Sequence, residues 1–399
     1  MTKQAKTASP PRPRLMLVTR NLPPLLGGME RLNLHIASEL LRDFELLIVG
    51  PTGCASRLPS ASVVYEVPHK PLWRFLSSAF LRVLRLSREY QVRCVIAGSG
   101  LTAPMALIGA RICGARSAVY VHGLDLVAPH PVYRWIWRPI LRRMDLCIAN
   151  SSYTAGLAAS IGIPNETICV LNPGLDLPDP EDPSTAADFR KSHGLHSRKV
   201  MLSVGRLTPR KGLLEFVREA LPAIVAVYPD AILVIIGDEA PDALVGGGAG
   251  MGNRIVDLAR SKGLSKNVCL LGPCDDLVLS AAYQTADVLV FPVRDVPGDV
   301  EGFGMVAIEA ASHGLQTVAF AVGGIGDAVA DGHSGWLVTA DDYLSLVERI
   351  IQVLTQGRST TVERRCRDFS AALAWPHFGI KLRALINRLL KSRPSPARA

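Results

Sequence analysis

The sequence lacks the features that mark secreted and membrane-spanning proteins. Its eight cysteines form no C-x-x-C pair and lie mostly in apolar segments, so they predict neither a disulfide framework nor a zinc site. The longest charge-free apolar run, residues 95–110, is too short and too rich in glycine for a good membrane span. Only four apolar residues, 15–18, follow the basic N-terminus, which argues against a signal peptide. We therefore expect a cytoplasmic protein.

Several catalytic motifs are missing as well. The chain contains no H-E-x-x-H, no G-x-S-x-G, no P-loop and no Asp-x-Asp pair near an expected strand end. Nothing in these patterns predicts a metal or a serine nucleophile. The chain also carries no signature of a DNA- or RNA-binding domain, so we expect no nucleic-acid partner.

The charge is unevenly distributed along the 399 residues, which carry a net charge of +9. Residues 1–180 hold 20 basic residues (Lys and Arg) and 11 acidic ones (Asp and Glu). Residues 181–399 hold 24 basic and 24 acidic residues. Two helical segments of the first half, 71–88 and 133–143, combine arginines with aromatic residues. Such helices favour an anionic membrane surface, although ordinary helices buried on one side fit each segment equally well.

Short apolar runs alternate with helix-length segments, which predicts βαβ units and parallel sheets. Strands are expected at residues 15–19, 44–50, 92–97, 117–121 and 146–150, and then at 200–204, 231–236, 268–271, 288–291, 317–320 and 336–338. Residues 172–183 contain four prolines and read as an interdomain linker. The expected fold is α/β, with two doubly wound, Rossmann-like domains that face each other. Ligands of such sheets bind at the carboxyl ends of the strands.

Two loops at expected strand ends carry features of phosphate binding. Gly27 and Gly28 stand between the first strand and the first helix, where backbone N–H groups can approach a phosphate. An ordinary strand-to-helix turn fits these glycines equally well. Arg206, Arg210 and Lys211 follow the first strand of the second domain and suit a diphosphate. The alternative for this loop is a solvated basic turn.

Two acidic residues frame a third loop. Glu301 precedes an expected helix that contains Glu309, and a helix N-terminus can bind phosphate while the carboxylates bind sugar or ribose hydroxyls. The alternative is a capping role for Glu301 and a surface position for Glu309. His122 stands at the end of a first-domain strand, where a functional and a structural role are about equally expected.

Together these motifs resemble glycosyltransferase family four, the retaining GT-B enzymes that use nucleotide sugars, from about Leu15 to Leu390. The resemblance rests on Gly27-Gly28, His122-Gly123, residues 172–176, Gly205-Arg206 with Lys211-Gly212, residues 236–238, Glu301-Gly302-Phe303-Gly304 with Glu309, and Gly323-Gly324. It implies an acceptor-binding domain over 14–176, a donor-binding domain over 184–375 and a terminal helix, 376–391, that returns to the first domain. Two features depart from the common pattern: Gly326 stands where many relatives carry Pro, and 246–253 is a glycine-rich insertion that fits either a lid or an inert loop.

The resemblance also implies a role for each site residue. Arg206 and Lys211 would neutralise the donor diphosphate, helped by backbone N–H groups. Glu309 would bind the ribose, Glu301 the donor sugar, and His122 would lie beside the reacting carbon. The implied catalytic set is His122, Glu301, Arg206 and Lys211, and the implied donor-binding set is Gly27, Gly28, Arg206, Lys211, Phe303, Gly304, Met305 and Glu309.

The function that follows is a retaining, metal-independent hexosyltransferase without a cofactor. It would move a sugar from a UDP- or GDP-linked donor to a lipid-linked saccharide or cell-envelope glycan, such as lipopolysaccharide or exopolysaccharide, as a peripheral protein on the inner face of the plasma membrane. Two alternatives remain: a sugar-nucleotide epimerase or phosphorylase on the same fold, and a non-catalytic sugar-nucleotide-binding protein. The intact acidic pair argues against the last.

Overall fold

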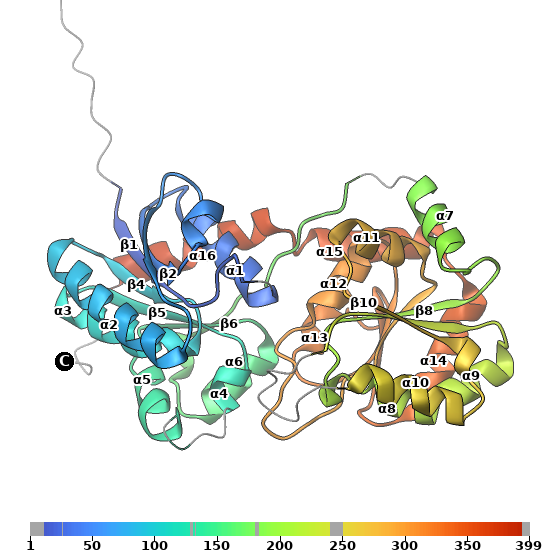
Figure 1. Ribbon diagram of the computed structural model, residues 1–399. Helices are drawn as coiled ribbons and strands as arrows, with labels where there is room; N and C mark the ends of the chain where they lie inside the picture. Colours follow the sequence, from blue (N-terminus) through green and yellow to red (C-terminus); the bar gives the residue numbers. More distant parts are fainter. Residues whose placement is uncertain are drawn as a thin grey trace, which may run out of the picture.

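The computed structural model describes residues 12–25, 27–127, 131, 133–179, 183–239 and 250–392. Figure 1 shows two α/β domains side by side, the first in blue to cyan and the second in green to orange. Each domain is built on one parallel sheet with helices on both faces. The expected architecture of two facing, doubly wound domains is therefore confirmed.

The first sheet has seven strands in the order β3-β2-β1-β4-β5-β6-β7. Their bounds are β1 (Arg14–Val18), β2 (Glu45–Pro51), β3 (Val63–Val67), β4 (Cys94–Ala97), β5 (Arg116–Val121), β6 (Leu146–Ala149) and β7 (Ile168–Val170). The five expected strands are present, and the two that the sequence analysis missed, β3 and β7, are the edge strands. Edge strands bury fewer of their side chains, so they lack the continuous apolar run that identifies an inner strand.

Helices cover both faces of the first sheet. Their bounds are α1 (Gly28–Leu40), α2 (Leu72–Glu89), α3 (Ala103–Ile112), α4 (Leu124–Val127), α5 (Arg138–Leu141), α6 (Ser152–Ser160) and α16 (Trp375–Lys391). On one face α2, α3, α5 and α6 bury apolar side chains in a common core. On the other face α1 and α16 do so. The helix expected at 133–143 consists of a π-helical turn, Tyr133–Trp137, followed by α5.

The second sheet has six parallel strands in the order β10-β9-β8-β11-β12-β13. Their bounds are β8 (Val200–Val204), β9 (Ile232–Ile236), β10 (Val268–Gly272), β11 (Val288–Phe291), β12 (Thr317–Phe320) and β13 (Gly335–Val338). All six were expected, because each strand reads as an apolar run, including the edge strands β10 and β13, which are only partly buried.

Most helices of the second domain connect these strands, whereas α7 precedes the first strand and α14 and α15 follow the last. Their bounds are α7 (Pro183–Ser192), α8 (Leu213–Glu215), a π-helical turn (Phe216–Ala220), α9 (Leu221–Val227), α10 (Met251–Ser261), α11 (Asp276–Thr285), α12 (Met305–Ser312), α13 (Ile325–Ala328), α14 (Tyr343–Gln356) and α15 (Thr360–Ala371). Of the expected glycine-rich insertion, residues 246–249 lie outside the described residues. Gly250 caps α10, and the next three residues form its first turn.

The chain crosses between the domains twice, at adjacent places. Leu175 leaves the first domain and bridges to Ala374, where the chain returns. Leu175 also accepts a backbone hydrogen bond from Trp375, at 3.2 Å. After this return α16 packs on α1, in the direction that the resemblance implied. The exact boundaries of the two domains stay a prediction.

Charge and close packing hold α16 in place. Arg383 of α16 forms an ion pair with the buried Glu39 of α1. Trp375 of α16 stacks on His35 of α1, with 3.9 Å between the ring centroids. A Cβ added to Gly379 would lie 1.9 Å from Oε2 of Glu39, so only glycine allows the two helices to approach this closely.

This close approach predicts opposite outcomes for two helical glycines. Gly379→Ala should destabilise the protein by about 1–3 kcal/mol, because the new methyl group displaces the paired Glu39 carboxylate. Gly156→Ala on α6 is the matched control, since nothing lies within 4 Å of its added Cβ. It should be neutral or stabilising, by up to about 1 kcal/mol. Thermal unfolding measures both, and equal melting temperatures for the two variants would contradict the tight contact.

Candidate functional site

The candidate site lies where strand ends of the two sheets meet. β8 leads into the basic turn of Arg206 to Lys211, β11 leads towards the Glu301 loop, and β12 leads into the Gly323-Gly324 turn. From the first domain, β5 ends immediately before His122. Because all strands of each sheet are parallel, their carboxyl ends gather at one edge, as expected.

Glu301 stands at the centre of a buried charge cluster. Lys211 donates a hydrogen bond to Oε2 of Glu301 at 2.8 Å, and Arg210 binds the same oxygen. Arg210 also donates to Asp299 at 3.0 Å. The side chains of Glu301 and Lys211 are each only 14% exposed. The ammonium of Lys211 lies 4.7 Å from the centroid of the Phe291 ring, which adds a cation–π contact.

The two cations decide the ionisation of Glu301. Burial alone would raise the pKa of a carboxyl group, because a charge loses hydration. Lys211 and Arg210 outweigh that cost and lower the pKa of Glu301 from 4.5 to about 2. The Glu301 carboxylate is therefore ionised throughout the physiological pH range.

Glu309 lies in a different environment, on α12. Its Oε2 accepts a hydrogen bond from the Tyr283 hydroxyl at 3.1 Å, and its Oε1 lies 3.8 Å from a guanidinium nitrogen of Arg31. Arg31 belongs to α1 of the first domain, so this ion pair spans the two domains. Burial raises the pKa of Glu309, and Arg31 opposes that shift only in part. Glu309 is thus not the surface residue of the structural alternative, and Arg31 balances its negative charge only in part.

His122 lies at the end of β5 and faces β4. Its ring nitrogen Nε2 lies 3.0 Å from the carbonyl oxygen of Gly98. A carbonyl can only accept, so Nε2 carries a proton and Nδ1 of the neutral ring can act as an acceptor. The backbone N–H of His122 donates to Asp125 at 2.9 Å, which fixes the loop that follows the strand.

The Glu301 loop contacts the His122 loop directly, across the domain boundary. A Cβ added to Gly302 would lie 2.1 Å from the carbonyl oxygen of His122. Gly324 supports the loop from behind, since its N–H donates to the carbonyl of Glu301 at 2.8 Å. The Glu301 loop of the second domain therefore packs directly against the His122 loop of the first.

The predicted backbone donors lie beside this contact. Gly27 is the N-cap of α1, and Gly28 lies opposite Met305, with 3.8 Å between its ideal Cβ position and the Met305 side chain. Gly304 caps α12 with a φ of 102°, a conformation that favours glycine. The first N–H groups of α1 and α12 lack intrahelical partners, and the two helix starts are close to each other at Gly28 and Met305. The Phe303 side chain is buried in the core of the second domain and shapes the turn.

The structure thus brings most of the expected residues together. Lys211 lies against the Glu301 loop. Arg206 is exposed on the same basic turn. Burial lowers the pKa of Lys211, Glu301 opposes that shift, and the nearby charges of Arg210 and Arg206 add to it. Sequence reasoning missed how Arg210 is used. Arg210 forms ion pairs with both Asp299 and Glu301, in the same buried cluster as Lys211. The two acids lie 89 and 91 residues from Arg210, so no local sequence signal could have shown these pairs.

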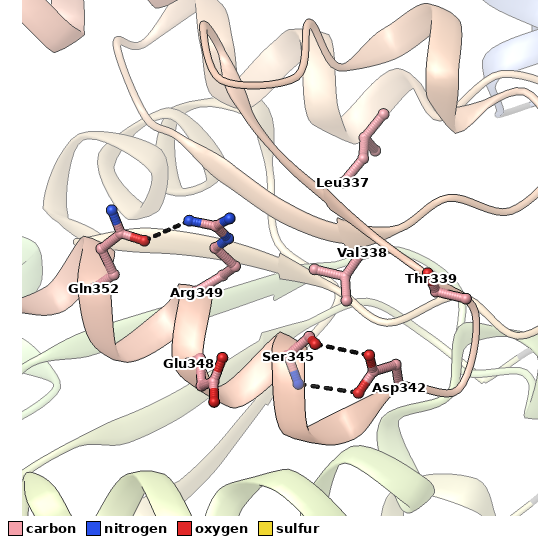
Figure 2. A pocket seen from close by; sticks show the side chains of 8 residues that line it. All are labelled: Leu337, Val338, Thr339, Asp342, Ser345, Glu348, Arg349 and Gln352. Carbon is pink, nitrogen blue, oxygen red and sulfur yellow. Dashed lines mark hydrogen bonds between the residues drawn. The ribbon is translucent and has the colours of Figure 1, made fainter.

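No group of three His, Cys, Asp or Glu residues among those that the structure describes is arranged to hold a metal ion. None of the helices in the same part of the chain combines the length and apolar character that a membrane span needs. A cavity of about 370 Å³ lies between the edge strand β13 and α14, lined by polar residues such as Asp342 and Arg349 (Figure 2). It contains none of the expected site residues.

Comparison with protein families agrees with this geometry. The family model described as "Glycosyltransferase Family 4" matches residues 26–178, and the one described as "Glycosyl transferases group 1" matches residues 185–370. The first match lies within the first domain and the second match within the second domain.

Individual relatives match over most of the chain. The GDP-mannose-dependent alpha-(1-6)-phosphatidylinositol monomannoside mannosyltransferase of Mycolicibacterium smegmatis is 31% identical, over 86% of this chain and 90% of that protein. The protein of the same description from Mycobacterium tuberculosis H37Rv is 30% identical, over 92% of this chain and 97% of that protein. The D-inositol 3-phosphate glycosyltransferase of M. smegmatis is 31% identical, over 68% and 60% respectively.

Solved structures share the fold at lower identity. A glycosyltransferase from Rickettsia africae superposes with a TM-score of 0.78 at 17% identity, covering 96% of this chain and 100% of that one. HepE of Anabaena in complex with UDP and glucose superposes with a TM-score of 0.76 at 20% identity, covering 94% and 99%. The two facing Rossmann-like domains are therefore a GT-B fold, as the resemblance implied. With both halves matched and relatives above 30% identity along most of its length, the chain belongs to glycosyltransferase family four.

Proposed function

We propose that this glycosyltransferase transfers mannose from GDP-mannose, with retention of configuration, to a lipid-linked inositol glycan of the cell envelope. The observation that carries the transfer chemistry is the contact between the Glu301 loop and the His122 loop, with Lys211 bound to Glu301. The choice of donor and acceptor is supported by the names of the relatives that match nearly the whole chain. Both relatives are named as enzymes that act on a phosphatidylinositol monomannoside, which supports an acceptor of that kind.

The donor would lie along the second domain. Its diphosphate meets Arg206 and Lys211 on one side and the N-termini of α1 and α12 on the other. Its ribose hydroxyls donate to the Glu309 carboxylate. Both cations of the buried cluster bind Oε2 of Glu301. Its other oxygen, Oε1, would accept a hydrogen bond from a hydroxyl of the donor sugar.

Transfer then needs three coupled changes. The bond between the anomeric carbon and the diphosphate oxygen breaks, and the acceptor oxygen bonds to that carbon on the same face. The acceptor proton passes to the departing diphosphate. Arg206, Lys211 and the helix N-termini stabilise the charge that builds on the leaving group, and they do so without a metal ion. His122 would orient the sugar at the reacting carbon.

The acceptor side suggests contact with a membrane surface. Trp73 is 65% exposed on α2, and Trp135 is 81% exposed on the π-helical turn before α5. Both elements belong to the same face of the first sheet, together with α3. Arg74 and Arg134 are exposed next to these tryptophans. Exposed indole rings beside arginines suit the headgroup region of an anionic bilayer, which would present a lipid-linked acceptor to the first domain.

The donor assignment predicts transfer by the purified chain. Incubation with GDP-mannose and a phosphatidylinositol mannoside should give an α-linked product, identified by NMR. Lys211→Met should slow turnover about ten- to a hundredfold, because a charge-assisted contact to the leaving diphosphate is lost. Lys262→Met removes an exposed lysine at the end of α10 and should leave turnover unchanged. A β-linked product would refute retention, and full activity of Lys211→Met would remove that residue's role.

Glu309 predicts how nucleotide binding depends on pH. Ribose hydroxyls donate to the ionised carboxylate, so protonation of Glu309 competes with binding. Because burial raises the pKa of Glu309 above 4.5, GDP affinity should fall, as the pH is lowered, at a higher pH than an exposed Glu would give. Glu309→Gln should bind GDP more weakly near neutral pH and lose this pH dependence. Calorimetry between pH 5 and pH 8 measures both, and identical profiles for the two proteins would assign Glu309 a structural role.

The membrane proposal is tested with vesicles. At low salt the protein should sediment with phosphatidylglycerol vesicles and not with phosphatidylcholine vesicles, and raised salt should release it. The double variant Trp73→Ala with Trp135→Ala should bind several-fold more weakly. Leu344→Ala is the matched control, because Leu344 is 81% exposed on α14 in the second domain. Equal binding of all three proteins would overturn this proposal.

A further inference from the structure

A hydrogen-bonded contact between the domains lies at Asp327 of α13, beyond the residues assigned to the donor. Oδ2 of Asp327 accepts a hydrogen bond from the backbone N–H of Ser152 at 2.8 Å and one from the Ser152 hydroxyl at 3.1 Å. The same oxygen accepts a third from Nδ2 of Asn172, at 2.9 Å. Asp327 belongs to the second domain, whereas Ser152 and Asn172 lie in the first. One carboxylate oxygen therefore joins three donors across the boundary.

The charge of Asp327 suits this position. Ser152 is the first residue of the nine-residue helix α6, whose N-cap is Ser151. The N–H groups at the start of a helix carry partial positive charge and lack intrahelical acceptors. A carboxylate accepts from them more strongly than a neutral amide would.

The contact continues towards His122. Nδ2 of Asn172 also donates to the carbonyl of Asn150, at 3.1 Å. Asn150 in turn directs its Nδ2 to the carbonyl of His122, at 3.4 Å. A chain of side-chain hydrogen bonds thus runs from the carboxylate of the second domain to the backbone of the histidine loop.

The same residue is tied to the acidic loop. Asp327 lies three residues after Gly324, whose N–H donates to the carbonyl of Glu301 at 2.8 Å. The turn that carries Asp327 therefore also supports the Glu301 loop. Asp327 connects the two loops that the proposed reaction needs to face each other.

We propose that Asp327 is a positioning residue, which holds the domains closed and thereby keeps His122 opposite Glu301. Its effect on turnover rests on the proposed function, whereas its effect on the domain arrangement does not. Asp327 is partly exposed and Ser152 is exposed, which lets water replace these hydrogen bonds when the domains separate. The contact therefore closes the site reversibly.

The test compares Asp327→Ala with Asp342→Ala. Asp342 caps α14 through Ser345 and makes its contacts within the second domain, as Figure 2 shows. Small-angle X-ray scattering of the nucleotide-free proteins should give a larger radius of gyration for Asp327→Ala than for wild type and Asp342→Ala. With GDP-mannose, kcat of Asp327→Ala should fall about tenfold or more, while Kd for GDP changes less than about threefold, because most donor contacts lie in the second domain.

A double-mutant cycle with Asn172→Ala tests the hydrogen-bonded chain. If Asp327 acts through Asn172, the double variant should lose little more kcat than Asp327→Ala alone, whereas independent losses that multiply would overturn the chain. Asp327→Asn keeps an acceptor oxygen and should fall between wild type and Asp327→Ala, which separates positioning from misfolding. Unchanged scattering of Asp327→Ala overturns the proposal. Absence of turnover in the wild type overturns only the proposed donor, and scattering then decides the role of Asp327.

Discussion

The ion cluster around Glu301 is the constraint on which the rest of the site depends. An ionised carboxylate that is 86% buried would be strongly destabilising alone. Two cations from one short turn offset the free-energy cost of burying this charge. Arg210 and Lys211 bring two positive charges, and Glu301 and Asp299 bring two negative ones. Since these four charges cancel, a diphosphate needs further compensation. The exposed Arg206 and the N-termini of α1 and α12 can supply it.

Glycine at the loop tips is what allows this cluster to approach the first domain. A Cβ at Gly302 would clash with the His122 carbonyl, and one at Gly324 would lie 2.0 Å from the carbonyl of Gly302. These residues do not serve flexibility, which is the usual interpretation of glycine in a sequence. They let two backbones pack in direct contact, so the loop that carries Glu301 lies against the loop that carries His122.

The sequence predicted what is local and missed what is distant. Inner strands and the order of the βα units follow from apolar runs, and the basic turn, Glu301 and Glu309 follow from position along those units. The edge strand β3 was missed because its side chains are half solvated. Arg210 and Asp299 are 89 residues apart, and Asn172 and Asp327 are 155 apart. No local pattern specifies such pairs, because tertiary packing creates them, within the second domain for Arg210 and Asp299 and between the domains for Asn172 and Asp327.

The way the cores divide explains how such a site can open. The four buried apolar clusters each lie essentially within one domain, with α16 completing a core of the first. The contacts between the domains described above are instead hydrogen bonds, glycine backbones and the ion pairs of Arg31 with Glu309 and Asp276, each at 3.8 Å. Separating the domains therefore exposes polar groups that water can satisfy, at small cost. Because the two chain crossings are adjacent at Leu175 and Ala374, they can act as one hinge, and closure about it restores the contact between Gly302 of the Glu301 loop and the His122 carbonyl.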